Sequence, residues 1–313
     1  MAVIEARQLS KSFPGRGRKA APVEAVRDVT FSIDAGERIA YIGPNGAGKS
    51  TSIKMLTGIL HPSAGAATVL GYVPWTERRH LAQRIGTLFG QRSQLWFQLT
   101  PRQAYRLLGD IYGLTRAEAA SRVDELGLLL EATDLFDRQV KGLSLGQRMR
   151  CELAASLLHS PEVLFLDEPT IGLDLVAKQR FREMIVRLNE EKGTTVFLTS
   201  HDVADIEHVA RRVIVINHGH VIYDDRVSTM RRSILSHKLL EVRFDESPGV
   251  LDIAAVEILK HSGLGYKLIV DTTVRSIKDV LDELLDRFVV GDISVEDPPL
   301  EDVIGNIYES PER

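Results

Sequence analysis

The sequence has little cysteine, no long apolar run and no excess of positive charge. Cys151 is its single cysteine, and one thiol cannot close an internal disulfide, so we expect a buried thiol and a reducing compartment. No apolar run approaches the ~20 residues that a membrane-spanning helix needs, and the first residues, MAVIEARQLS, lack the apolar core of a signal peptide. We therefore expect a soluble, cytosolic chain. A formal net charge of -4 disfavours a nucleic-acid binder that relies on a broad basic face.

Apolar residues still make up 44% of the 313 positions, which is enough for a sizeable core and two domains. From residue 162 onward, apolar runs of strand length at 163–167 and 195–199 alternate with amphipathic helical patterns. This alternation predicts an α/β fold with a mainly parallel sheet covered by helices. Residues 212–225 predict a hairpin with His218 and Gly219 at its turn.

Two capping patterns indicate helices between residues 100 and 140. Thr100 precedes a proline and a helical pattern, and Thr115 is followed three residues later by Glu118, as in a capping box. We predict a first domain over residues 1–232 that contains a helical subdomain at about 95–160.

After about residue 235 the pattern becomes that of a small α+β domain, predicted over residues 236–313. Its expected elements are strands over 238–245, 266–273 and 289–297, a helix over 276–288 capped by Ser276, and a closing helix over 298–309.

A glycine-rich stretch follows the apolar strand pattern at 38–43 and precedes a helical pattern. It matches G-x-x-x-x-G-K-[ST], the signature of a phosphate-binding loop. Glycines allow successive N–H groups to face an anion, and the helix start adds free N–H donors and partial positive charge. The alternative is a glycine-rich turn with a chance lysine. The predicted loop and first helical residues are Gly43, Pro44, Asn45, Gly46, Ala47, Gly48, Lys49, Ser50 and Thr51.

Two adjacent carboxylates, Asp167 and Glu168, end the apolar run VLFL. We expect this strand to run parallel to the strand before the glycine loop, which would bring Asp167 to the loop. Asp167 and the Ser50 hydroxyl are then expected to hold Mg²⁺ together. Successive side chains of a strand point to opposite sides, so Glu168 is the candidate general base that polarises a water. The alternative is a solvated acidic strand end.

Two further stretches carry polar groups at the ends of core elements. Ser144 and Gly146 precede a long apolar-faced helix, which predicts a second helix N-terminus suited to an anion. His201 directly follows TVFLTS (195–200), which has the pattern of a buried strand. At the end of this strand His201 is placed to touch a phosphate. A structural role for His201 stays equally open at this stage.

Five motifs now stand in one order along the chain: GPNGAGKST (43–51), LFGQ ending in Gln91, LSLGQR (143–148), VLFLDEP (163–169) and TSHD (199–202). In this set the sequence resembles the nucleotide-binding subunit of an ABC transporter, and the resemblance covers residues 3–230. It implies a P-loop ATPase domain that binds ATP and Mg²⁺. It also implies that two such domains pair head to tail, each ATP lying between the glycine loop of one and the LSLGQ segment of the other.

The resemblance implies a role for each matching residue. Ser144, Gly146 and Gln147 would contact the γ-phosphate bound by the partner. Asp174, in IGLD (171–174), would support the dimer interface, and His201 would stabilise the γ-phosphate. Gln91 would approach Mg²⁺ and the attacking water, and report to the membrane partner.

Some residues depart from the family pattern. Phe13 stands where an aromatic ring, more commonly tyrosine, stacks on adenine; a core residue is the alternative. Leu145 replaces a common glycine, and the loop at 14–24 is longer than usual. For Trp96 and Phe97, which follow Gln91, core packing and contact with a membrane partner are both open.

The ending DISVEDPPLEDVIGNIYE resembles bacterial exporter ATPases with a C-terminal extension, among them the viologen and multidrug exporter-like subgroup. The implied partners are a second ATPase subunit, expected to be an identical copy, and integral-membrane permease subunits of one or two kinds, with no nucleic acid. The implied location is peripheral, on the cytoplasmic face of the inner membrane. The alternatives are an importer ATPase and a soluble ABC ATPase acting on ribosomes or DNA. A kinase or GTPase would leave LSLGQ unexplained.

Overall fold

The computed structural model describes residues 1–15, 21–89, 93–235 and 237–296. Contacts divide the chain into two compact units, Met1–Asp225 and Arg226–Arg313. Within the described residues, no helix is both long and apolar enough to cross a bilayer. The closing helix predicted over 298–309 lies outside the described residues. The domain boundaries given above stay a prediction.

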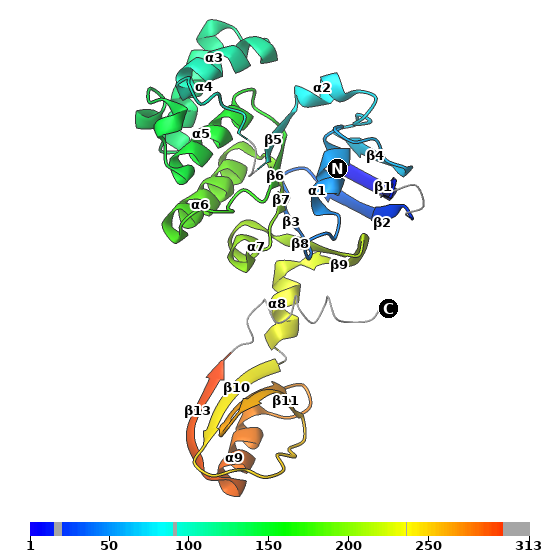
Figure 1. Cartoon of the computed structure of the whole chain (residues 1–313), viewed down its shortest axis with the longest axis vertical. Helices are drawn as coiled ribbons and strands as arrows, with labels where there is room; N and C mark the ends of the chain where they lie inside the picture. Colours follow the sequence, from blue (N-terminus) through cyan, green and yellow to red (C-terminus); the bar gives the residue numbers. More distant parts are fainter. Residues whose placement is uncertain (16–20, 90–92, 236, 297–313) are drawn as a thin grey trace. The chain divides into compact units, whose positions relative to one another are not determined.

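A mainly parallel sheet forms the centre of the first unit, in the order β5-β6-β7-β3-β8-β9 (Figure 1). Its strands are β3 (Arg38–Ile42), β5 (Ile85–Phe89), β6 (Val163–Asp167), β7 (Thr195–Thr199), β8 (Arg212–Asn217) and β9 (His220–Arg226). Neighbours from β5 to β8 are parallel, which confirms the predicted α/β class. Between β8 and β9, His218 and Gly219 have φ angles of 46° and 86°, as a tight hairpin turn requires.

Strand β6 is buried on both faces, and its residues alternate between two apolar clusters. Leu164 and Leu166 belong to the cluster formed with the helical layer, whereas Val163 and Phe165 belong to the cluster on the opposite face. A strand covered on both sides needs apolar residues at every position, which explains the unbroken run VLFL. The strand that ends in Asp167 is thereby fixed by packing on both sides.

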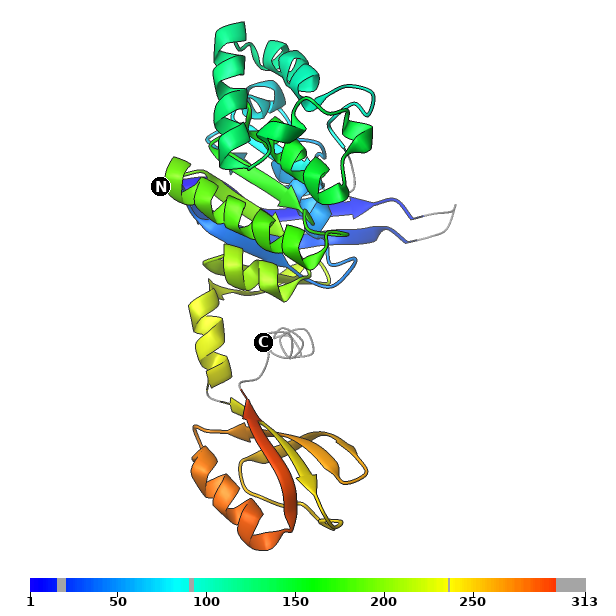
Figure 2. The ribbon, with the colours of Figure 1, turned by 90° about the vertical axis from the view of Figure 1, so that its left-hand side faces the viewer.

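An antiparallel sheet in the order β2-β1-β4 covers one face, and its long strands β1 and β2 are the dark blue ones in Figure 2. Helix α1 (Lys49–Leu56) lies between this sheet and the central sheet (Figure 1). Ile53 and Leu56 of α1 share a buried cluster with Ile4 of the antiparallel sheet and Tyr41 of β3. The strands of this sheet are β1 (Ala2–Phe13), β2 (Val23–Asp34) and β4 (Ala64–Val69). The short α2 (Arg78–Ala82) precedes β5.

Helices cover the other face and extend beyond it. They are α3 (Pro101–Tyr112), α4 (Arg116–Leu129), α5 (Leu145–Leu157), α6 (Leu175–Lys192) and α7 (Val203–Val209), with short 3₁₀ turns at Thr133–Leu135 and Val140–Gly142. Thr100 caps α3 and Thr115 forms a capping box at the start of α4, as predicted, and Thr100 forms a capping box as well. Asp174 caps the start of α6, and Gly193, with φ at 69°, ends it.

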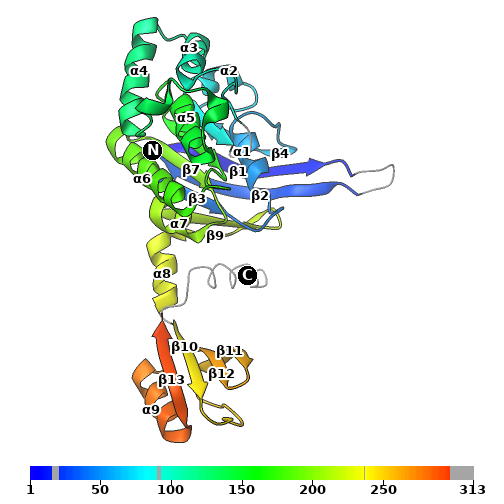
Figure 3. The same cartoon turned by 60° about the vertical axis from the view of Figure 1, so that its left-hand side comes forward.

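The second unit is a small α+β domain, as predicted, with strand order β11-β12-β10-β13 and α9 packed on one face (Figure 3). Leu240 and Phe244 of β10 meet Val280 and Leu284 of α9 in its core. The elements are α8 (Val227–Leu235), β10 (His237–Phe244), β11 (Val256–Ser262), β12 (Gly265–Asp271), α9 (Ile277–Arg287) and β13 (Val290–Glu296).

Candidate active site

The glycine loop after β3 has a shape that other residues could not adopt. Gly46 and Gly48 have φ angles of 86° and 108°, in the region that side chains disfavour. A Cβ on Gly48 would lie 2.3 Å from the Ala25 carbonyl oxygen, and one on Gly43 would lie 2.2 Å from that of Ile216. The glycines are therefore required both by backbone angles and by close approach of neighbouring strands.

Helix α1 begins at Lys49 with Gly48 as its N-cap, and no side chain in the described part of the chain caps its first turn. Its first N–H groups and the positive end of the helix dipole therefore face the loop. The Lys49 ammonium is buried and donates to the carbonyl oxygens of Gly43, at 2.6 Å, and Pro44, at 3.3 Å. Burial lowers the pKa of Lys49, and the nearby carboxylates of Glu168 and Asp167 oppose that shift. The free N–H groups, the helix dipole and the Lys49 ammonium together form a cradle whose chemistry suits an anion.

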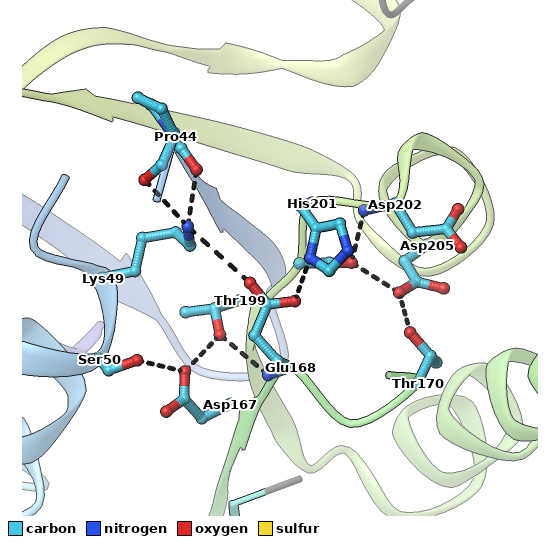
Figure 4. Close-up of polar contacts among 12 residues, drawn as sticks. Pro44, Lys49, Ser50, Asp167, Glu168, Thr170, Thr199, His201, Asp202 and Asp205 are labelled. Carbon is cyan, nitrogen blue, oxygen red and sulfur yellow. Dashed lines mark hydrogen bonds and ion pairs between the residues drawn. The ribbon is translucent and has the colours of Figure 1, made fainter. Parts of the chain in front are cut away.

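Asp167, at the end of β6, lies beside the first turn of α1 (Figure 4). Its Oδ1 accepts hydrogen bonds from Ser50 Oγ at 3.1 Å and from Thr199 Oγ1 at 2.7 Å. The Ser50 and Asp167 oxygens thus converge, as the sequence predicted, and such hard oxygen donors suit Mg²⁺. Thr199 was not among the predicted site residues, because it meets Asp167 through the register of two parallel strands, which the sequence does not reveal.

Glu168 has a left-handed backbone, with φ at 52°. Its N–H is held by Thr199, whose carbonyl and hydroxyl oxygens are both 3.1 Å away. Its carboxylate lies between two basic groups, with Oε1 3.8 Å from Lys49 Nζ and Oε2 2.7 Å from His201 Nδ1 (Figure 4). A left-handed backbone is costly for a residue with a side chain, and such residues cluster at functional sites. Glu168 is therefore well placed for proton transfer beside the cradle.

A buried polar cluster lies behind His201, and sequence reasoning did not find it. Asp205 of α7 is 1% exposed and accepts from Thr170 Oγ1 at 2.6 Å, Ser200 Oγ at 2.7 Å and Arg182 Nε at 2.6 Å. Thr170 follows Glu168 by two residues, and Ser200 directly precedes His201. The cluster therefore ties together the two loops that carry Glu168 and His201.

Ser144 and Gln147 form a capping box at the start of α5. Gln147 N donates to Ser144 Oγ at 3.3 Å, and Ser144 N donates to Gln147 Oε1 at 3.0 Å. Asp174 caps α6 by accepting from Ala177 N at 2.8 Å, and Gly146 faces that same turn, where an added Cβ would lie 2.9 Å from Ala177 Cβ. These segments line a hollow of about 440 Å³. No hydrogen bond or ion pair among the described residues joins Ser144 to Lys49 or Glu168.

The structure describes some of the remaining residues named in the sequence analysis and leaves one of them outside the described ranges. Phe13 ends β1, and the Lys11 ammonium lies 5.3 Å from its ring centre. Gln91 lies outside the described residues. Trp96 and Phe97 are 45% and 44% exposed, so core packing is the wrong reading for both. Leu145, the departure in LSLGQ, packs against the buried cluster of the helical layer.

Comparisons with known proteins agree with this geometry. The family described as ABC transporter matches residues 26–171. The chain is 36% identical to the ABC transporter ATP-binding protein NatA of Bacillus subtilis, over 69% of this chain and 88% of that protein. It is 34% identical to the Nod factor export ATP-binding protein I of Burkholderia thailandensis, over 69% and 71%. It is 31% identical to the methionine import ATP-binding protein MetN 1 of Acinetobacter baylyi, over 77% and 70%.

Among solved structures, the chain is similar to cbiO1 from Clostridium perfringens, part of the ABC transporter complex cbiONQ. The TM-score is 0.64 and the identity 26%, over 74% of this chain and 94% of that one. The similar proteins thus include one named for export and one named for import.

Proposed function

Because this chain belongs to the ABC transporter family, as the ATP-binding and ATP-hydrolysing subunit of a transport system, we propose that it powers export through separate membrane permeases. Two subunits pair head to tail and enclose each ATP between the glycine loop of one and the Ser144 segment of the other. One observation supports the pairing. Lys49, Asp167 and Glu168 lie together at the glycine loop, whereas Ser144 lines a separate hollow, so that a second subunit is needed to bring a Ser144 to the ATP.

In the cradle, backbone N–H groups and the Lys49 ammonium bind the phosphates. Ser50 and Asp167, whose oxygens lie 3.1 Å apart, fit Mg²⁺, and Gln91 is proposed as a further ligand. Bound there, Mg²⁺ would neutralise negative charge on the phosphate oxygens. Phe13 is proposed to stack on the adenine. The proposed phosphate contacts are Gly43, Pro44, Asn45, Gly46, Ala47, Gly48, Lys49, Ser50 and Thr51.

Glu168 is the proposed general base, which accepts a proton from the attacking water. His201 holds one Glu168 oxygen at 2.7 Å and directs the carboxylate, and its exposed ring can reach the γ-phosphate. Lys49, 3.8 Å from the other oxygen, supplies positive charge beside the phosphates, where the ADP leaving group gains negative charge as its bond to the γ-phosphorus breaks. The base, the group that orients it and the positive charge therefore come from three elements: Glu168 follows β6, His201 follows β7 and Lys49 begins α1.

The Ser144 segment provides the second half of the ATP site. Ser144, Gly146 and Gln147 are proposed to contact the γ-phosphate bound by the partner, and Asp174 to support the interface. ATP then stabilises the closed pair by its higher affinity for that state. Hydrolysis removes the phosphate that both subunits contact, and the pair opens.

Export is supported by the similar Nod factor export ATP-binding protein. We propose that the chain belongs with exporters of the viologen and multidrug type. Its permeases, of one or two kinds, would contact the surface near Gln91 that includes Trp96 and Phe97. The chain would lie peripherally on the cytoplasmic face of the inner membrane. Import remains the second candidate, because the similar import ATPase aligns over 77% of this chain.

The test is to isolate the tagged chain from native membranes in mild detergent and to identify the membrane proteins bound to it. The complex is then reconstituted in liposomes with the ATPase subunits outside, and a panel of lipophilic cations is supplied with ATP. Export predicts ATP-dependent accumulation in the lumen, and import predicts depletion from it. Recovery with ribosomes and without a permease would contradict the proposal.

A further inference from the structure

Glu152 is a buried carboxylate that the proposed catalytic steps do not use. It lies on α5, eight residues or a little over two turns after Ser144, and is 2% exposed. None of the ion pairs found among the described residues involves it. Its neighbours Cys151, Leu153 and Ala154 are apolar and buried. Burying an unpaired carboxylate is expensive, so an apolar residue would serve packing better here.

The Glu152 carboxylate accepts hydrogen bonds from one short segment. Its Oε1 accepts from Ser93 Oγ, and its Oε2 accepts from Gln94 N at 2.9 Å. Burial raises the pKa of Glu152, and these hydrogen bonds oppose that shift. The Leu95 backbone and the positive charge of Arg148 also lower the pKa of Glu152, so the carboxylate is compensated chiefly by hydrogen bonds from the segment that begins at Ser93.

The same segment is fixed a second time to the central sheet. Gln94 Nε2 donates to the carbonyl oxygen of Thr87, in β5, at 2.5 Å. In sequence, Ser93 follows Gln91 by two residues, and Trp96 follows Gln94 by two. Residues 93–94 thus connect β5, α5 and the start of the exposed Trp96-Phe97 pair.

We propose that Glu152 is a positioning residue for ATP hydrolysis: by holding residues 93–94 against α5, it links the segment that follows Gln91 in sequence to the helix that begins after Ser144. The inference rests on the proposed function, in which Gln91 serves the ATP bound by its own subunit and Ser144 serves the ATP of the partner. Closure on one ATP then moves the segment that follows Gln91 at the other.

Two variants separate this role from packing. Glu152→Leu keeps the approximate volume but leaves Gln94 N without an acceptor. Glu152→Gln keeps the hydrogen bonds, because its carbonyl can accept from Gln94 N while its amide donates to Ser93 Oγ. For the intact full-length chain, we expect Glu152→Leu to lower kcat for ATP hydrolysis by ~10-fold with KM within about twofold, and Glu152→Gln to recover most of the rate.

Ser93→Ala tests the other side of the contact without changing α5. We expect it to lower kcat by ~3-fold at an unchanged KM, which keeps the proposal testable if Glu152→Leu does not fold. A kcat within twofold of the parent for Glu152→Leu would overturn the proposal. So would equal losses in the Leu and Gln variants, since a conservative variant should restore a positioning contact.

Trp96 offers a direct readout of the link. Trp75→Phe leaves Trp96 as the single tryptophan, and Glu168→Gln allows ATP to bind with little turnover. We expect ATP to change Trp96 fluorescence in this background, and Glu152→Leu to abolish the change while sedimentation still shows ATP-driven pairing. An intact fluorescence response in Glu152→Leu would overturn the proposed role of Glu152 and leave the proposed function standing. Absence of pairing in the parent would contradict the proposed function and the inference with it.

Discussion

His201 Nδ1 lies 2.7 Å from Glu168 Oε2, and this contact joins the strand end that carries the acid pair to the loop that follows β7. Since a carboxylate accepts, the imidazole donates from Nδ1 in this arrangement, which leaves Nε2 to face outward. The carboxylate is thereby oriented by a group from a neighbouring strand.

The first prediction concerns Glu168. Glu168→Gln preserves shape but removes the basic carboxylate, so we expect ATP hydrolysis to fall by ~100-fold or more while ATP binding is kept. Steady-state phosphate release and nucleotide titration measure the two effects. The matched control is Glu162→Gln at the opposite end of β6, where the exposed Glu162 pairs with Arg84, and turnover should not change. Near-normal turnover in Glu168→Gln would remove the assignment of the base.

The second prediction concerns Lys49. Lys49→Ala removes the only ammonium seen in the cradle among the described residues, so we expect nucleotide affinity to fall by ~10-fold or more. Equilibrium titration with a fluorescent ATP analogue measures it. Lys54→Ala, in the last turn of the same helix, is the control and should bind as the parent does. Equal affinity in Lys49→Ala and the parent would contradict the phosphate cradle.

The third prediction concerns pairing. Ser144→Arg places a bulky cation where the partner's ATP is proposed to lie, so we expect ATP-driven pairing to be lost and ATP binding to the monomer to be kept. Sedimentation with and without ATP, in the Glu168→Gln background, measures pairing. Ser144 is also an N-cap, and losing a cap costs about 1 kcal/mol.

Thr115→Arg is the control for this loss, because Thr115 caps α4 with the same capping box and lies outside the proposed ATP site. It should pair normally. Pairing of Ser144→Arg to the same extent as the control would argue against a site shared between subunits.

The fourth prediction concerns stability. Arg182→Leu leaves the buried Asp205 carboxylate without its cationic partner, and we expect the free energy of unfolding to fall by about 3–5 kcal/mol. Arg187→Ala breaks an exposed pair with Glu191 on the same helix and should change it by less than about 0.5 kcal/mol. Denaturant unfolding monitored by circular dichroism measures both. Similar small losses in the two variants would contradict the importance of the buried pair.

The fifth prediction concerns Cys151. Burial raises the pKa of its thiol to about 12, so the folded state keeps the thiol protonated when an unfolded chain would lose the proton. The stability from this group is complete below the unfolded pKa, near 8.5, and is lost as pH rises from there toward 12. At pH 8 we expect thiol reagents to modify Cys151 only as fast as the protein opens, measured by mass spectrometry with and without denaturant. Rapid labelling of the native chain would contradict this burial.

Much of the fold was predictable because its signals are local. Capping at Thr100 and Thr115, the hairpin at His218, and the strand, glycine loop and helix around Lys49 each depend on a few consecutive residues. The adjacent carboxylates at 167 and 168 were found for the same reason.

Other features depend on residues brought together from distant parts of the chain. Thr199 reaches Asp167 only through the register of two parallel strands. Asp205 meets Thr170 and Arg182 across two loops, which no spacing in the sequence reveals. Strand β11 was missed because most of its residues are exposed, so that burial imposes no clear alternation.

At Glu168 the residue that the proposed hydrolysis needs is not the residue that best fits the backbone, because its left-handed conformation disfavours a side chain. A glycine there would adopt the same angles without steric strain of ~1 kcal/mol or more. Selection for thermal stability alone would therefore favour replacement of Glu168 by glycine. Stabilised variants recovered without a turnover requirement should be sequenced at this codon first.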